Sequence, residues 1–247
     1  MSFDPGEQPL PHSVGNNGAV VRVGDTVRRP VGPHTPGVHA FLRHLAERGF
    51  DGAPHVLGID EKGREILSYV EGDVLPDDET EPPEWAVTDE ALVSVVTLVR
   101  RLHEAAAGFV PPDGVAWAWP AAPEYRGTLV GHNDYCRANV VFRGGRAAAF
   151  IDFDWTTPTT PAWELANVVA HWVLRMPGDR VARARLVRAT YPVAGLRTAL
   201  LRRQEWGMYL VKARVDAGDP GFVQMWADGG YERSRALSAW AAEHLDD

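Results

Sequence analysis

The segment Thr128 to Trp155, TLVGHNDYCRANVVFRGGRAAAFIDFDW, gathers polar side chains around one predicted hairpin. Leu129 to Val130 indicates a short apolar strand, and His132 and Asp134 follow at its end. Asn139 comes five residues after Asp134, within reach of the same irregular loop. This segment is therefore the first place to look for chemistry.

A returning strand is expected to bring a second carboxylate toward this loop. Val140 to Phe142 and Ala147 to Ile151 have the pattern of paired strands, because Gly144 and Gly145 supply a turn between them. Asp152 comes at the end of the second strand. Carboxylate and amide oxygens are hard ligands that suit magnesium. The alternative is an ordinary hairpin with Asp and Asn in its turns, where these residues are common.

The order His132, Asp134, Asn139, Asp152 resembles the catalytic core of protein-kinase-like phosphotransferases, most closely the aminoglycoside phosphotransferase and choline kinase branch. HNDYCRAN matches the family's His-x-Asp-x-x-x-x-Asn, and IDFDW matches its Ile-Asp-aromatic-acidic form of the Asp-Phe-Gly motif. Two motifs at the right separation favour the resemblance over a chance hairpin. It implies that Asp134 accepts the proton of the attacking hydroxyl, that Asn139 and Asp152 hold magnesium, and that His132 braces the loop.

Composition excludes several other classes of protein. The chain has 247 residues, enough for one two-lobed unit, and a formal net charge of −8, which disfavours nucleic acid as a partner. Its single cysteine, Cys136, excludes an internal disulfide and fits a reducing cytosol. No apolar run approaches the length that crosses a bilayer, and the first residues lack a signal-sequence pattern. We therefore expect a cytoplasmic protein without a membrane partner.

The first part of the chain indicates a small antiparallel sheet. Residues 13–19, SVGNNGA, place Gly15 and Gly18 before a hairpin with a Gly24-Asp25 turn. Glycines there would let backbone amides approach nucleotide phosphates, although a plain surface turn fits the local sequence equally well. The first ten residues read as an extended arm with no element.

The resemblance implies a lysine on the next strand, held by a glutamate from the following helix, and this chain has neither. Its only lysines are Lys62 and Lys212, so Arg28 or Arg29 must serve, and we favour Arg28. The helix expected from about Thr35 to Gly49 offers Val38 and His39 where the glutamate would lie. No salt bridge is evident from the sequence, which means either a compensated pair or weak nucleotide binding.

A hinge between two lobes is expected at SYVEG, residues 68–72. The resemblance implies that backbone groups of Ser68, Tyr69 and Val70 contact the nucleotide base, and Gly72 would let the chain turn. The predicted domains are residues 1–72, a nucleotide-covering lobe, and 73–247, a catalytic and acceptor-binding lobe. Residues 73–84 are rich in proline and acid and read as a surface linker.

The second lobe is predicted to be mainly helical, which gives an α+β, bilobal, protein-kinase-like fold. A helix should start at Thr88 or Asp89, and another at Pro161, where PAWELA resembles the family's Pro-x-x-Asp-Leu-Ala with Glu164 in place of aspartate. Three helical segments follow, at about 180–189, 196–217 and 230–244. Their numerous arginines read as solvated faces, and seven tryptophans of this lobe are candidates to shape an acceptor site.

We expect a magnesium-dependent phosphotransferase that moves the γ-phosphate of ATP, or of GTP, to a hydroxyl of a small molecule, such as an antibiotic or other natural product. Carboxylates and arginines are interspersed in the last third of the chain, which favours a neutral or weakly charged acceptor over a polycationic aminoglycoside. The alternative is a catalytically weak or inactive nucleotide- or metabolite-binding regulatory protein. A protein kinase is disfavoured because no Ala-Pro-Glu closes an activation segment.

Overall fold

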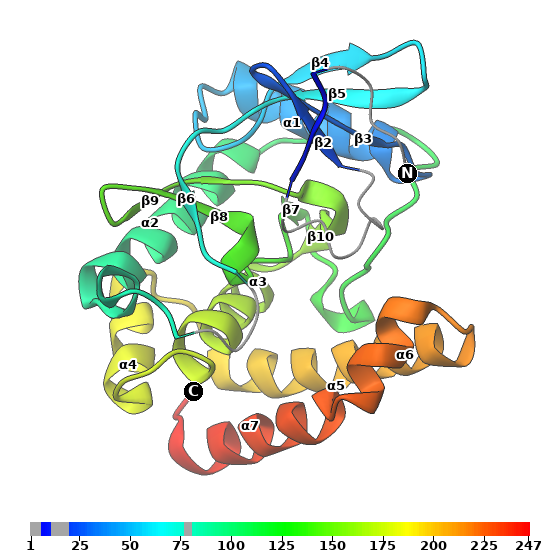
Figure 1. The fold of residues 1–247 in the computed structure, drawn as a ribbon. Coiled ribbons are helices and arrows are strands. Elements are labelled where there is room, and N and C mark those ends of the chain that lie inside the picture. Colours follow the sequence, from blue (N-terminus) through cyan, green and yellow to red (C-terminus); the bar gives the residue numbers. More distant parts are fainter. Residues whose placement is uncertain (1–5, 11–19, 77–80) are drawn as a thin grey trace.

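A sheet with one helix lies above a larger helical part in the computed structural model, which describes residues 6–10, 20–76 and 81–247 (Figure 1). The upper part contains β1 (Gln8–Pro9), β2 (Val21–Val23), β3 (Thr26–Pro30), α1 (Thr35–Glu47), β4 (Val56–Ile59) and β5 (Arg64–Ser68). The predicted arrangement of an antiparallel N-terminal sheet followed by a mainly helical part is confirmed.

The upper sheet has five strands in the order β1-β2-β3-β5-β4, all antiparallel. Its register places Arg29 directly opposite Glu65. Helix α1 buries Phe41, Leu42 and Leu45, and the ring of Phe41 contacts those of Phe109 and Phe153 at centroid distances of 5.1 and 6.3 Å. Strand β1 corrects the expectation of an arm without any element, because Gln8–Pro9 pairs with β2.

The lower part is built on α2 (Asp89–Ala106), whose N-cap Thr88 accepts a hydrogen bond from the amide of Ala91 at 3.1 Å. One face of α2 is apolar and fully buried, as a helix at the centre of a lobe requires; it consists of Leu92, Val95, Val96, Val99 and Leu102. The other elements are β6 (Asp73–Val74), β7 (Leu129–Gly131), β8 (Val140–Arg143), β9 (Arg146–Phe150), β10 (Thr157–Thr159), α3 (Pro161–Val168), a π-helical turn (Val169–Leu174), α4 (Arg180–Thr190), α5 (Leu196–Asp216), α6 (Pro220–Ala227) and α7 (Gly230–His244).

Two small sheets hold the predicted hairpin in place. Strands β8 and β9 form that hairpin, and β6 pairs with β8, so the start of the expected surface linker is a strand. Gly72 lies just before β6 at φ +146°, where a Cβ would come within 2.5 Å of the carbonyl oxygen of Phe142. Strand β10 pairs with β7, although its residues were expected to form a loop.

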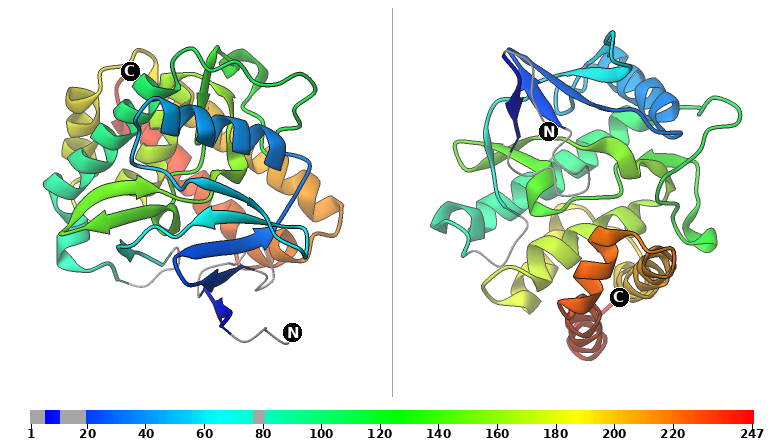
Figure 2. Two further views of the ribbon diagram at one scale, coloured as in Figure 1. Left: turned by 90° about the horizontal axis from the view of Figure 1, so that it is seen from above. Right: turned by 45° about the vertical axis from the view of Figure 1, so that its right-hand side comes forward.

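Helices α5, α6 and α7 cover the bottom of the lower part, and the C-terminus lies beside α4 (Figures 1 and 2). Helix α6 was not predicted, because a segment of eight residues between two breaks carries little periodicity. Trp163 and Trp172 pack in the core rather than shaping an acceptor site. Within the described ranges, no helix combines the length and apolar character needed to cross a membrane.

Candidate active site

His132 connects the two halves of the predicted motif. It is fully buried, its Nε2 donates to the carbonyl of Ile151 at 2.9 Å, and its Nδ1 accepts from the amide of Asp134 at 3.2 Å. Its ring also meets Phe153 edge-on at a centroid distance of 4.4 Å. Burial lowers the pKa of His132, which matches a neutral ring that donates on one side and accepts on the other. His132 therefore links the loop at Asp134 to the backbone just before Asp152.

Asp134 and Asn139 lie together at the end of β7. Asn139 Nδ2 donates to the Asp134 carboxylate at 2.8 Å, and the Asn139 carbonyl accepts from the amide of Ile151 at 3.0 Å. Asn139 thus touches both Asp134 and the residue that precedes Asp152. Because its nitrogen faces Asp134, its amide oxygen is the atom left for a cation.

Glu164 steadies this loop from α3. Its carboxylate is fully buried and accepts from the amide of Asn133 at 3.2 Å and from the hydroxyl of Tyr135 at 2.6 Å. Burial would raise the pKa of Glu164, but His103, Tyr135 and Arg203 outweigh it and hold that pKa below its usual value. A Cβ at Gly131 would come within 2.3 Å of the same carboxylate, so the close approach requires glycine.

Asp152 and Arg29 join the two parts of the molecule. Asp152 takes a left-handed φ of 60° two residues after the end of β9, and its side chain is 46% exposed. Arg29, on β3, donates to Asp152 Oδ1 at 2.7 Å and also pairs with Asp154. His34 Nε2 lies 3.2 Å from the same Asp154 carboxylate, and this hydrogen bond raises the pKa of His34.

Glu65 is the partner that sequence reasoning missed. Arg29 Nε donates to Glu65 Oε1 at 2.5 Å, and His39 Nε2 lies 2.6 Å from Glu65 Oε2. Burial acts to lower the pKa of Arg29, but Asp152, Asp154 and Glu65 outweigh it, so that pKa is raised. The missing lysine and glutamate are thus matched by an arginine on β3 and a glutamate on β5, with His39 of α1 behind them.

Arg28 points elsewhere. Its guanidinium bonds to Thr26 Oγ1 and lies 3.8 Å from Asp60, away from Asp152. Arg29, and not Arg28, is therefore the arginine of β3 that contacts Asp152. The available signal was the pairing of β3 with β5, which sets Arg29 against a glutamate on the inward face of the neighbouring strand.

The backbone groups of the predicted hinge differ in whether they are available to contact a nucleotide base. The amide of Ser68 donates to the carbonyl of His55 at 2.9 Å, and the amide of Tyr69 donates to that of Asp25 at 2.8 Å. These two amides are therefore not donors for a base in this conformation, which leaves the carbonyl groups and Val70 for that role. Gly15 and Gly18, predicted to approach phosphates, lie outside the described residues.

The donor set suits magnesium that is bound mainly by its nucleotide. In the part of the chain that the structure describes, no three side chains of His, Cys, Asp or Glu gather as a metal site. Asn139 and Asp152 supply one amide and one carboxylate, and Mg²⁺ commonly takes one or two protein oxygens and completes its shell with phosphates and water. The residues present fit such an ion.

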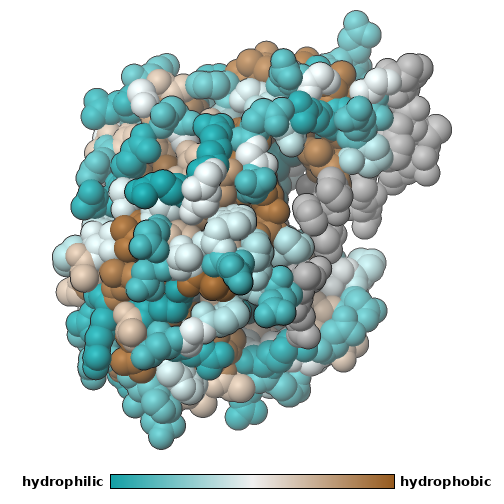
Figure 3. Space-filling view, turned by 60° about the vertical axis from the view of Figure 1, so that its left-hand side comes forward, coloured by the Kyte–Doolittle hydropathy of each residue, from teal (hydrophilic) through white to brown (hydrophobic). Residues whose placement is uncertain are grey.

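An aromatic stack borders the catalytic loop on the other side. The Trp119 ring stacks on Trp155 at 4.5 Å and 9°, and on Phe222 of α6 at 5.8 Å and 11°. The Trp119 carbonyl accepts from Asn133 Nδ2 at 3.1 Å, which places the stack one residue from Asp134. On the face shown in Figure 3, by contrast, hydrophobic residues are scattered among hydrophilic ones.

Comparison with known proteins agrees with this geometry. Residues 115–206 match the model of the phosphotransferase enzyme family, known as APH. The matched segment contains His132, Asp134, Asn139 and Asp152. A curated protein, the trifolitoxin immunity protein of Rhizobium leguminosarum bv. trifolii, is 36% identical over 157 residues, which are 62% of this chain and 58% of that protein. The chain thus matches less than two thirds of that relative's length.

Solved structures of APH-like proteins share the fold. A choline/ethanolamine kinase family protein from Mesorhizobium loti has a TM-score of 0.64 at 16% identity, covering 93% of this chain and 88% of that one. A GDP complex of aminoglycoside 2′-phosphotransferase-IIIa gives 0.60 at 16% identity, with coverage of 89% and 88%. An aminoglycoside phosphotransferase from Streptomyces rimosus with ADP and streptomycin gives 0.56 at 18% identity, with coverage of 80% and 90%.

Proposed function

We propose that this protein is a magnesium-dependent phosphotransferase that moves the γ-phosphate of ATP or GTP to a hydroxyl of a small molecule. The observation that carries the proposal is the cluster of Asp134, Asn139 and Asp152 around one hairpin, with Arg29 brought to it from the upper sheet. The family of the catalytic segment supports it. We keep residues 1–72 as the nucleotide-covering lobe and 73–247 as the catalytic lobe.

Each residue has a separate task in the proposed reaction. Asp134 orients the acceptor hydroxyl and takes its proton as the oxygen attacks the γ-phosphorus. Asn139 and Asp152 hold magnesium, which neutralises the charge that builds up on the phosphates. Arg29 supplies a fixed positive charge, and because three carboxylates hold it, its direction is set before nucleotide enters.

The acceptor is proposed to be neutral or weakly charged. Polycationic acceptors need massed carboxylates to replace their water, whereas the stack of Trp119, Trp155 and Phe222 offers aromatic surface beside the loop. The name of the Rhizobium relative ties it to immunity against trifolitoxin, which supports testing toxins and antibiotics as acceptors.

A second candidate is a nucleotide-binding regulatory protein with little or no transfer. It is favoured by one observation, the ion pair of Arg29 with Asp152, because that contact occupies a carboxylate that magnesium needs. In this case nucleotide would bind and no phosphate would move.

Two measurements separate the candidates. Thermal unfolding with ATP and with GTP, each with and without magnesium, tests nucleotide binding. Mass spectrometry across a panel of sugars, nucleosides, macrolides, aminoglycosides and toxins then seeks the gain of one phosphate, with Asp134→Ala as the inactive control. Binding with transfer supports the enzyme, binding without transfer to any acceptor supports the regulatory protein, and absence of binding contradicts both.

A further inference from the structure

Arg203 of α5 makes contacts with the candidate site that the motifs in the sequence do not explain. Its Nη1 donates to Asn133 Oδ1 at 2.6 Å, and its Nη2 donates to the carbonyl oxygen of Asn133. Its guanidinium also lies 5.2 Å from the centre of the Trp163 ring. The expectation that the arginines of this region form solvated helix faces is therefore wrong for Arg203.

Asn133 is the residue before the proposed base and has a strained backbone. Its φ is +68°, a left-handed value that asparagine tolerates but that most residues avoid. Asn133 is fully buried, and Trp163 Nε1 donates to its Oδ1 at 3.1 Å. The direction of Asp134 depends on this conformation, because the backbone turns there between β7 and the loop.

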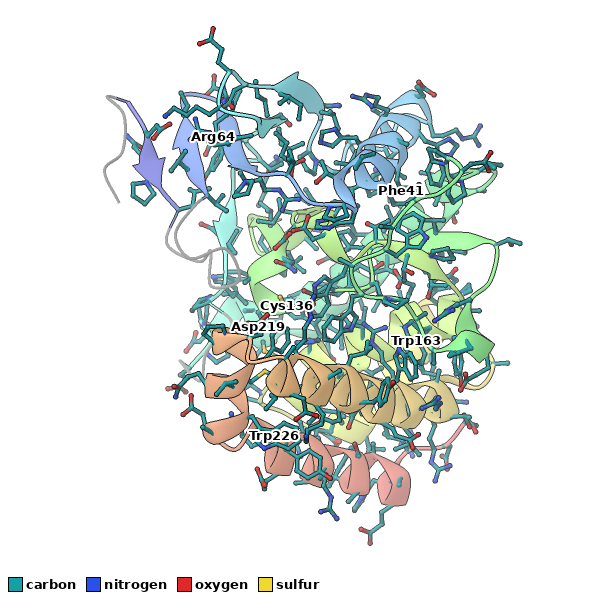
Figure 4. All side chains as sticks on the ribbon, turned by 90° about the vertical axis from the view of Figure 1, so that its right-hand side faces the viewer. Phe41, Arg64, Cys136, Trp163, Asp219 and Trp226 are labelled. Atoms are coloured by element: carbon teal, nitrogen blue, oxygen red, sulfur yellow. The ribbon has the colours of Figure 1, made fainter. Side chains whose placement is uncertain are left out.

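Arg203 contacts both the side chain and the backbone of Asn133. It binds the side-chain oxygen and the backbone oxygen together, as the fork of a guanidinium permits and a single-point donor does not. Burial lowers the pKa of Arg203, while the charges of Glu164 and Asp134 act to raise it. A partly desolvated cation is thus kept beside the catalytic loop. Figure 4 shows Trp163 and Cys136 lying above α5, the helix that carries this arginine.

We propose that Arg203 is a positioning residue, which holds Asn133 in its left-handed conformation and so aims Asp134 at the acceptor hydroxyl. The part that concerns the hydroxyl rests on the proposed function. Since α5 and α6 are consecutive and Phe222 of α6 stacks on Trp119, the helix that holds the loop also leads to the aromatic surface proposed for the acceptor.

The test compares two adjacent arginines of α5. Arg203→Met removes the guanidinium and keeps a linear apolar stem against Trp163. Arg202→Met is the matched control, because Arg202 pairs with the exposed carboxylates of Glu124 and Glu205 and lies over the Trp206 ring, away from Asn133. Hydrogen exchange of peptides spanning residues 130–136, in protein without nucleotide, reports on the loop directly. Turnover and the nucleotide KM report on its consequence, using water or an acceptor found in the panel.

Arg203→Met should exchange at least about tenfold faster in the loop, whereas Arg202→Met should match the parent. The kcat of Arg203→Met should fall about 10- to 100-fold, because a misaligned base slows transfer. Its nucleotide KM should stay within about twofold of the parent value, because nucleotide binding is not weakened. Arg203→Lys, which keeps charge but loses the fork, should lie between the two and serves if the methionine variant does not fold.

Parental loop exchange in both Arg203 variants would overturn the proposal. So would faster exchange spread equally over α3, α5 and the loop, since that pattern means general loosening. A parent protein that transfers no phosphate would instead refute the enzymatic function, and the exchange comparison would still decide whether Arg203 holds Asn133.

Discussion

Asp134 is half-buried, and its carboxylate accepts from Asn139 Nδ2 while its amide donates to His132 Nδ1. We expect Asp134→Ala to reduce kcat by about 10² to 10⁴, because the hydroxyl loses its proton acceptor and its orienting partner. Nucleotide affinity should change little. Steady-state kinetics with nucleotide titration measure both quantities, and Asp113→Ala, at an exposed loop position, is the control. Parental turnover in Asp134→Ala would remove Asp134 from the mechanism.

Arg28 and Arg29 are neighbours on β3 with opposite surroundings, which makes them a matched pair. Arg29→Ala should weaken nucleotide binding by about 1.5 to 3 kcal/mol through loss of a charged hydrogen bond, while Arg28→Ala should bind as the parent does. Isothermal titration with Mg·ATP measures the difference.

The same substitution should also lower stability. Without Arg29, the buried carboxylate of Glu65 keeps only His39 as a close partner, and removing one member of a buried ion pair costs about 3 to 5 kcal/mol. Arg29→Lys keeps a charge there and is the variant to use if Arg29→Ala does not fold. Weakened binding in Arg28→Ala alone would return the role to Arg28.

Helix α6 packs against α5 and α7, and one of its aromatic rings joins the stack beside the candidate site. It contributes no fully buried residue, and Phe222 is its contact with the Trp119 stack. Phe222→Ala should raise the acceptor KM several-fold, leave the nucleotide KM unchanged and alter tryptophan fluorescence, because a ring is removed from the face of Trp119. Val223→Ala, at a position 42% exposed on the same helix, is the control. Equal effects of both variants would mean that α6 acts only as a whole.

The spacing of residues in the sequence predicted most of the helices and the loop from His132 to Asn139. Contacts between segments far apart in the chain could not be predicted in this way. The order of His132, Asp134 and Asn139 is local in the chain, so a motif could reveal it. The contact of Arg29 with Glu65 depends instead on the register between β3 and β5, which the alternation of residues does not fix. Arg203 escaped prediction for a related reason, because helical periodicity does not tell which arginine of α5 faces a buried asparagine 70 residues earlier.

Acid should destabilise the molecule before its carboxylates begin to titrate. Burial lowers the pKa of His132 and lowers that of His171 well below the usual value, so both stay neutral when folded and take up protons on unfolding. The unfolded state then binds more protons below the ordinary histidine pKa of about 6.5, and each residue contributes up to about 1.4 kcal/mol per pH unit. His34, with a raised pKa, has the opposite sign and offsets part of this loss.

Urea unfolding at pH 7.5, 6.5 and 5.5 measures this slope. The free energy of unfolding should fall as pH decreases through this range, and His171→Gln should flatten the fall by removing one of the two groups. A free energy independent of pH between 7.5 and 5.5 would contradict the inference.

The network around Arg29 joins the upper sheet to the lower part of the molecule. Its Glu65 and His39 partners belong to the upper part, and its Asp152 and Asp154 partners follow β9 in the lower part. In the proposed reaction, magnesium that entered with nucleotide would compete with Arg29 for Asp152, so nucleotide binding would change how the two parts are held together.

The network around Arg29 includes no lysine side chain, and this affects experiments that detect kinases by chemical labelling. Nucleotide analogues that acylate a lysine in the ATP cleft would find a guanidinium at Arg29, and the two lysines of the chain are about half-exposed and paired with Glu7 and Asp216. Surveys that detect kinases by such labelling would therefore overlook this protein even when it is abundant and active. Dicarbonyl reagents, which modify arginine, would report the proposed nucleotide site instead.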